Sequence, residues 1–357
     1  MIKRFTTILA VLAASTAFAQ ETAPAAPVAE APKAEFKVKN SAYGTIFASY
    51  AQQYVGDSLT TNAMVLERAY LGFKSEFAEN WSADVKIDLA KSRIESVPKT
   101  YTVTNKDIKE PEYRPTYVKE AYVKYSKDKF SLMAGMVPTT EVGYQLKHWG
   151  NRYILNTATD ISKVGVTSAD IGLVAEYKIN DMFSADFSIY NGEGFSTPQM
   201  DQEYTQLLGV SAKLPAGIVA RAYGSFTSDT VLRKIGDANN PETIFGGLLG
   251  IKTLQDKLTV GVEYSQASNW KNIEDAKAAV SSVYGTFDVT PKIQCFLRGD
   301  MNTLEAKKDE EVKSNLYLAG AQYKFNKNVR VSCDYQQSKV EDKDALNGFY
   351  IHSEIKF

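Results

Sequence analysis

From Ser41 to Phe357 the chain repeats one pattern, in which apolar and polar residues alternate one by one. In the last segment Phe349, Ile351 and Ile355 share a face with Phe357, while tyrosine, histidine, glutamate and lysine occupy the opposite face. Side chains of a β-strand point alternately to its two sides, so such a segment predicts a strand with one apolar and one polar surface. About sixteen segments of this kind follow one another along the chain.

The connections between these segments alternate in length. Seven short ones contain the Asn, Asp, Gly or Pro that tight turns require, and they lie at residues 77–81, 126–129, 180–182, 214–217, 254–257, 290–292 and 326–328. Eight longer polar stretches lie near residues 54–62, 91–116, 137–166, 191–203, 229–241, 268–278, 302–313 and 339–347. An even number of strands, with short turns at one end and long loops at the other, is typical of outer-membrane barrels. The pattern predicts an all-β fold over residues 41–357: a transmembrane antiparallel up-and-down β-barrel of about 16 strands, with short periplasmic turns and long outside loops.

The charged face of these strands is expected to line water. A barrel of sixteen strands encloses an aqueous channel rather than a packed core, so the apolar face must point outward to lipid. The pore-wall residues predicted in this way include Arg68, Lys74, Asp84, Lys86, Asp88, Arg221, Arg298 and Arg330. Both signs of charge occur among the inward residues, which predicts weak ion selectivity.

The third outside loop, residues 137–166, is the longest uninterrupted connection and carries large apolar residues such as Trp149 and Ile154. A fully exposed loop would not need them, so we expect this loop to fold inward, pack on the barrel wall and narrow the pore. A surface loop that packs only on its neighbours is the alternative. Charge acts most strongly in a narrow, partly desolvated passage. The candidate constriction and selectivity residues are Glu141, Lys147, His148, Arg152 and Asp160.

These five residues have different expected effects on ions. Lys147 and Arg152 would favour anions, and Glu141 and Asp160 would oppose them. His148 would add positive charge at low pH.

The first 40 residues lack the alternating pattern of the strands. Residues 1–19 combine Lys3 and Arg4, an apolar centre and a small-x-small site at 17–19, which is typical of a cleaved secretory signal peptide. Its apolar centre is too short to span a membrane. Residues 20–40 are rich in Ala, Pro and Glu and are predicted to form an extended periplasmic linker, either a flexible leader or an attachment to another part of the envelope.

Composition argues against several classes of function. Without the signal peptide the chain has 39 basic and 42 acidic residues, a formal net charge of −3, so we expect no nucleic-acid partner. Two histidines and two cysteines without clustering predict no zinc site, and we expect no cofactor. A barrel hydrolase needs a serine and a histidine in contact, oriented by a third residue. Ser332 and His352 are expected to come only loosely together on the last two strands, so we do not expect an enzyme.

Three short motifs resemble a known family. Arg68–Lys74, which reads Arg-Ala-Tyr-Leu-Gly-Phe-Lys, resembles the second-strand pattern of the phosphate-selective porin O and P family of Gram-negative outer membranes. Ala134–Pro138 and Ile189–Gly194 are similar to that family too, and the resemblance covers most of residues 41–357. It implies a trimeric, water-filled channel inserted by the barrel assembly machinery, with Phe357 as part of the recognition signal. Phosphate specificity depends on a dense inward cluster of Arg and Lys, which the predicted wall lacks.

Together these observations predict a porin of the Gram-negative cell outer membrane that lets small hydrophilic solutes and ions diffuse passively. We expect a homotrimer in contact with outer-membrane lipid and lipopolysaccharide. Two alternatives stay open: an anion-selective, phosphate-type porin that uses Lys147 and Arg152, and a structural barrel that anchors the envelope through residues 20–40.

Overall fold

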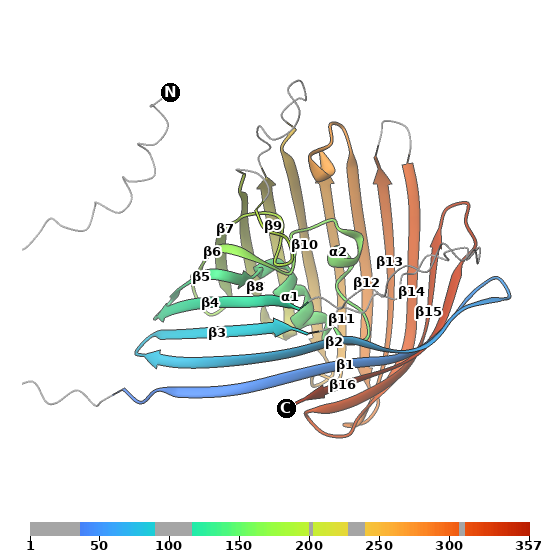
Figure 1. Cartoon of the computed structure of the whole chain (residues 1–357), viewed down its shortest axis with the longest axis horizontal. Coiled ribbons are helices and arrows are strands. Elements are labelled where there is room, and N and C mark those ends of the chain that lie inside the picture. Colours follow the sequence, from blue (N-terminus) through green and yellow to red (C-terminus); the bar gives the residue numbers. More distant parts are fainter. Residues whose placement is uncertain (1–35, 90–115, 200–202, 228–239, 307–310) are drawn as a thin grey trace, which may run out of the picture. The chain divides into compact units, whose positions relative to one another are not determined.

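The barrel is closed and consists of sixteen antiparallel strands. The computed structural model describes residues 36–89, 116–199, 203–227, 240–306 and 311–357. Each strand pairs with its neighbours in the chain, and β1 closes the ring by pairing with β16 (Figure 1). The predicted all-β barrel and its strand number are confirmed. The predicted signal peptide and most of the predicted linker lie outside the described residues.

The first half of the barrel contains β1 (Lys39–Val55), β2 (Ser58–Ala78), β3 (Trp81–Asp88), β4 (Tyr117–Lys127), β5 (Phe130–Pro138), β6 (Ala169–Lys178), β7 (Phe183–Tyr190) and β8 (Thr205–Lys213). The second half contains β9 (Ile218–Thr227), β10 (Glu242–Thr253), β11 (Leu258–Ser268), β12 (Lys277–Asp288), β13 (Ile293–Glu305), β14 (Glu311–Lys324), β15 (Val329–Val340) and β16 (Leu346–Lys356). The helices of the described residues are α1 (Thr140–Trp149), α2 (Ala158–Ser162) and two short 3₁₀ helices, η2 (Pro215–Gly217) and η3 (Trp270–Asn272). Among the described residues, no helix is long and apolar enough to cross a membrane.

The two faces of the strands differ as the alternation predicts. On the outer face Phe73, Leu249 and Leu297 expose 48%, 59% and 60% of their surface. On the inner face Asp88 and Arg298 expose 0% and 3%. Apolar side chains thus surround the barrel, while charged side chains point to its interior.

The seven short turns lie where the sequence places them, but the first outside loop does not. Only Gly56 and Asp57 separate β1 from β2, and Gly56 supplies the positive φ, +56°, that this tight turn needs. The prediction of a long loop at 54–62 was wrong because its polar residues continue the strands. Tyr50, for example, donates a hydrogen bond of 2.7 Å to Asn62 across the hairpin.

Candidate functional site

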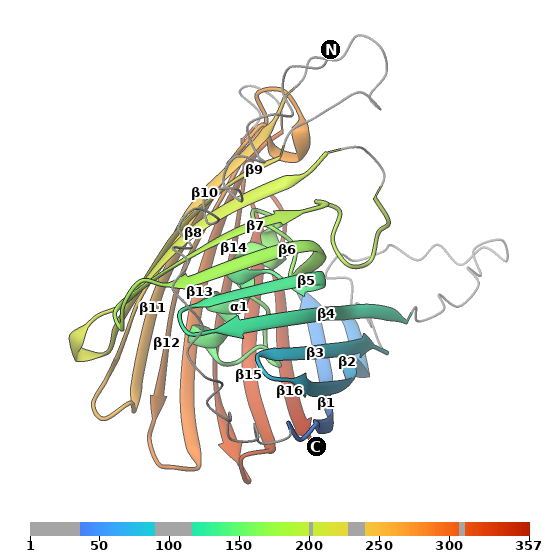
Figure 2. The ribbon, with the colours of Figure 1, turned by 90° about the vertical axis from the view of Figure 1, so that its left-hand side faces the viewer.

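The connection between β5 and β6 lies inside the ring of strands (Figures 1 and 2). It contains α1 and α2, and its middle is bonded to distant strands of the wall. Tyr153 donates to Gln322 on β14 at 3.0 Å, and Arg298 on β13 donates to the carbonyl of Asn156 at 2.6 Å. Arg330 on β15 donates to the carbonyl of Gly150 at 3.0 Å. Residues 140–166 therefore cross the interior of the barrel, and we call them the inner loop.

Apolar packing holds the inner loop against the wall. Trp149, Tyr153 and Ile154 are 2%, 3% and 5% exposed, and they form one cluster with wall residues that include Phe47 and Phe296. Complete burial of a large apolar side chain contributes roughly 1.5–3 kcal/mol. The large apolar residues that are out of place in an exposed loop thus have partners inside the barrel.

A buried ion pair anchors the start of the inner loop. Arg221 on β9 donates to Asp186 on β7 at 2.6 and 2.9 Å, and both side chains are nearly inaccessible to water. Thr140, the first residue of α1, donates to Asp186 at 2.8 Å and accepts from Arg221 at 3.1 Å. Helix α1 therefore begins on a pair of opposite charges that belong to the wall.

Every basic residue predicted on the wall has an acidic partner. Two pairs are Lys86–Glu120 at 2.6 Å and Arg298–Asp300 at 2.6 Å, and a looser one is Lys74–Asp84 at 3.4 Å. The remaining pairs are Arg68–Asp88, Arg221–Asp186 and Arg330–Glu354. Because the two charges within each pair cancel, most of the wall presents little net charge. The unpaired charged residues therefore decide the electrostatic potential of the interior.

Glu141 is fully buried between α1 and the end of the inner loop. Its exposed fraction is 0%, and it accepts a hydrogen bond of 3.3 Å from the backbone N–H of Val166. Burial raises the pKa of its carboxyl group to about 7. Glu141 thus joins the two ends of the inner loop and does not face water.

His148 is also removed from water. Its Nδ1 lies 3.0 Å from the hydroxyl of Tyr284 on β12, which itself donates to Glu263 at 2.8 Å. The tyrosine hydrogen is therefore used, and the neutral imidazole donates through Nδ1. Burial, and secondly the charge of Lys252, lower the pKa of His148 to about 4. The histidine carries no charge at neutral pH and acts as a contact between α1 and the wall.

This contact predicts that acid loosens α1. The docked histidine binds fewer protons than a released one, whose pKa would be about 6.5. The docking of α1 on the wall therefore weakens as the pH falls from about 6.5 to about 4. At higher pH, protonation of His148 does not affect it. We expect wild-type protein in a planar bilayer to show less steady current over that interval, and the His148→Gln variant to lack this change. Identical pH profiles of the two proteins would contradict the assignment.

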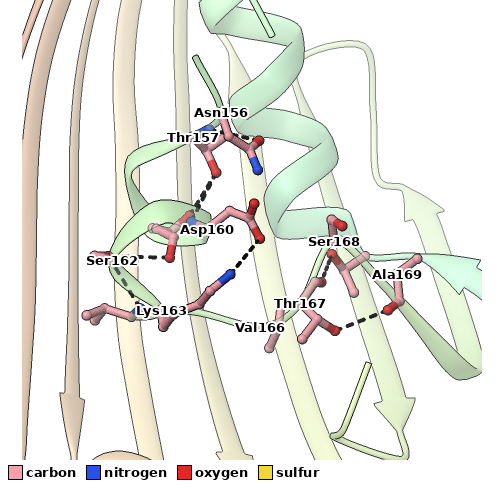
Figure 3. Close-up of polar contacts among 12 residues, drawn as sticks. Asn156, Thr157, Asp160, Ser162, Lys163, Val166, Thr167, Ser168 and Ala169 are labelled. Carbon is pink, nitrogen blue, oxygen red and sulfur yellow. Dashed lines mark hydrogen bonds and ion pairs between the residues drawn. The ribbon is translucent and has the colours of Figure 1, made fainter. Parts of the chain in front are cut away.

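Of the five predicted loop residues, Lys147, Arg152 and Asp160 reach water. Lys147 is exposed, and the other two are half-buried. Figure 3 shows the Asp160 carboxylate turned toward Lys163, at 3.7 Å. Asp160 also interacts electrostatically with Arg68 on β2, and Arg152 interacts with Tyr70 on the same strand. The structure therefore places Arg152 and Asp160 opposite β2 and Lys147 elsewhere.

Two chambers lie along the inner loop. The outer chamber, of about 570 Å³, is lined by Arg152, Leu155 and Ile161 of the loop and by the outer ends of β12–β16. The inner chamber, of about 650 Å³, is lined by Thr140, Tyr144 and Lys147 and by the turn-side ends of β4–β10. The five predicted loop residues thus do not form one ring. Glu141 and His148 are buried in the packing, Lys147 lines the inner chamber and Arg152 the outer one, and Asp160 lines neither.

Strict alternation missed one charged residue of the interior, Lys119. A β-bulge between Val118 and Glu120 places Lys119 on the same side as Glu120, so both residues are 8% exposed and both point inward. Lys119 donates to Ser168 and lies 3.6 Å from the centre of the Phe195 ring. Three further lysines line the inner chamber, namely Lys178, Lys213 and Lys252. Alternation places them on the inward face, although they were not among the predicted pore-wall residues.

Ser332 and His352 are closer than the sequence suggested. They are direct partners in the β15–β16 register, and Nε2 of His352 lies 3.3 Å from Asp334. Both residues are less than 5% exposed, and Tyr153 of the inner loop lies against the imidazole with ring centres 6.4 Å apart. The pairing of adjacent strands brings them together, and the inner loop covers them.

Comparisons with solved structures identify the architecture. OmpF of Salmonella typhi in complex with daunomycin aligns with a TM-score of 0.67 at 13% identity, over 89% of this chain and 97% of that one. A trimer form of OmpT, an outer membrane protein of Vibrio cholerae, aligns with a TM-score of 0.65 at 15% identity, over 90% and 99%. An anion-selective porin from Comamonas acidovorans aligns with a TM-score of 0.64 at 11% identity, over 90% and 100%. At these identities the likeness shows the fold, a sixteen-stranded barrel of the outer-membrane porin type.

No protein-family model and no curated protein matches the chain. The resemblance to the phosphate-selective porin O and P family therefore stays a prediction.

Proposed function

We propose that the protein is a porin of the Gram-negative outer membrane, which lets small hydrophilic solutes and ions diffuse through a water-filled passage. The observation that carries the proposal is the inner loop, which lies inside a closed barrel and leaves chambers of about 570 and 650 Å³ beside it. An interior of compensated ion pairs suits water and ions and does not form a dry core. Export through a cleaved signal peptide and assembly as a homotrimer complete the proposal, the latter supported by the trimer form of the structurally similar OmpT.

A preference for anions is a second candidate, and the inner chamber favours it. Seven basic residues line this chamber against four acidic ones, Asp128, Glu176, Asp181 and Asp186. Three of the basic residues are paired, at 2.6 Å for Arg221–Asp186, 2.8 Å for Lys178–Asp181 and 3.5 Å for Lys124–Glu176. The surplus of lysines raises the local concentration of anions. The anion-selective porin of similar fold agrees with this preference.

Single-channel current in a planar bilayer tests both proposals. We expect discrete open steps, grouped in threes, and under a salt gradient a reversal potential on the anion side. Lys147→Gln should move the reversal potential toward zero, because it removes an exposed charge from the inner chamber. Lys39→Gln, at a distant exposed pair with Glu76, is the matched control and should not move it. Folded protein without any steps would overturn the channel proposal, whereas steps with a reversal near zero would overturn only the anion preference.

A further inference from the structure

The outer chamber has an apolar wall. Leu304, Leu316, Val340 and Leu346 lie at the outer ends of β13, β14, β15 and β16 and line this chamber. By the two-residue period they stand in line with inward residues such as Asp300 on β13. All four are half-buried, so part of each apolar side chain is in contact with the water of the chamber.

The inner loop adds apolar surface to the outer chamber. Leu155 packs against the same buried cluster as Leu316, and Ile161 on α2 remains 39% exposed. Trp270 of η3 stands at the rim, where its indole N–H donates to the carbonyl of Lys163 at 2.9 Å. Apolar side chains from four strands, the inner loop and η3 therefore line this chamber. Elsewhere along the passage the wall is charged, and most of its charged residues form ion pairs.

One basic side chain of this chamber has no acidic partner among the described residues. Glu67 accepts a hydrogen bond of 2.6 Å from Ser49 and forms no ion pair with that side chain, and Arg68 is paired with Asp88. The guanidinium of Arg152 is half-buried and has no hydrogen-bond or ion-pair partner among the described residues. A free guanidinium offers a planar pair of donors that matches a carboxylate.

We propose that the outer chamber binds monocarboxylates with an apolar alkyl or aryl body, holding the carboxylate at Arg152 and the body against Leu304, Leu316 and Leu346. Its volume of about 570 Å³ lies within the range of roughly 300–1,000 Å³ that is usual for small-molecule sites. A single free guanidinium favours one carboxylate over two, and the apolar wall favours a body that leaves water. This inference deepens the proposed porin function by naming a class of solute, and it rests on that function only for the route of entry.

A chain-length series tests the apolar wall. Acetate, butyrate and hexanoate are added to the open channel, and the concentration that halves the current is measured. Burial of each methylene group should strengthen the block about fourfold. Butanol and hexanol, which lack the carboxylate, should block at least tenfold less well than the matched acids. A block that does not depend on chain length, or equal block by the alcohols, would overturn the proposal.

Variants locate the site. The Leu304→Asn/Leu316→Asn double variant should lose the dependence on chain length, while Arg152→Gln should weaken block by every acid about tenfold and keep that dependence. Lys39→Gln, at the exposed pair with Glu76, is the matched control and should keep both. Wild-type behaviour of both outer-chamber variants would overturn the assignment.

Binding is measured separately by calorimetry on the folded protein in detergent, with hexanoate and hexanol as the two probes. Calorimetric binding of hexanoate without any channel current would overturn the proposed function and leave the site intact. Normal channel current without binding or block would overturn the proposed site and leave the porin function intact.

Discussion

Replacing Arg298 by alanine is expected to lower the free energy of unfolding by about 3–5 kcal/mol, the usual cost of leaving one member of a buried ion pair alone. Arg298 and Asp300 are 3% and 2% exposed, and their side chains form two hydrogen bonds of 2.8 and 2.6 Å. The guanidinium also donates to Asn156 of the inner loop and lies 5.4 Å from the centre of the Trp149 ring. Its loss removes a support of the loop and leaves the Asp300 carboxylate buried without its partner. Urea unfolding in lipid, followed by tryptophan fluorescence, measures the difference.

Two further variants separate charge from packing. Lys74→Ala breaks a wall pair whose lysine is largely exposed, so it should cost about 1 kcal/mol or less. Arg298→Met combined with Asp300→Leu removes both charges at similar volume and should recover most of the stability. If the double variant were as unstable as Arg298→Ala, the cost would come from packing on the inner loop and not from the uncompensated carboxylate.

The barrel was predictable because its signal is repeated in every strand. Alternation from Phe349 to Phe357, or from Phe183 to Ile189, depends only on the period of a strand and on one side facing an apolar medium. Turn positions followed from Asn, Asp, Gly and Pro, and Asn80 and Asp128 indeed take positive φ values of 66° and 51° in two of these turns. Local chemistry therefore fixes both the strands and their connections.

The arrangement of the interior was less predictable because it depends on residues far apart in the sequence. Apolar side chains such as Trp149 indicate that the inner loop packs on something, but not which partner they meet. Glu141 was predicted to oppose anions in the constriction and His148 to add positive charge there at low pH, whereas the packing of α1 buries both. The bulge at Lys119 adds one residue to β4, and no local pattern distinguishes it from regular alternation.

The fit of α1 to the wall depends on Gly250, which has no side chain, and we expect Gly250→Ala to disturb this fit. A Cβ atom at Gly250 on β10 would lie 2.1 Å from Nε2 of His148, far inside the normal contact distance. The ring cannot move away freely, since its other nitrogen is held by Tyr284 and its neighbour Trp149 is 2% exposed. The end of α1 must therefore shift, at a cost of about 1–3 kcal/mol for overpacking. We expect a single-channel conductance that differs from wild type and fluctuates more.

Matched variants show whether the clash with His148 is the cause. Gly224→Ala on β9 is the control, because its Cβ would meet only the carbonyl oxygen of Ile244 at an ordinary 3.7 Å. It should leave both the conductance and the free energy of unfolding close to wild type. Combining Gly250→Ala with His148→Ala removes the ring that the new methyl group meets, so the double variant should have the same conductance as His148→Ala alone. If Gly250→Ala alone left the current unchanged, α1 would not be held at this distance from β10, and the contact between His148 and the wall would not control the passage.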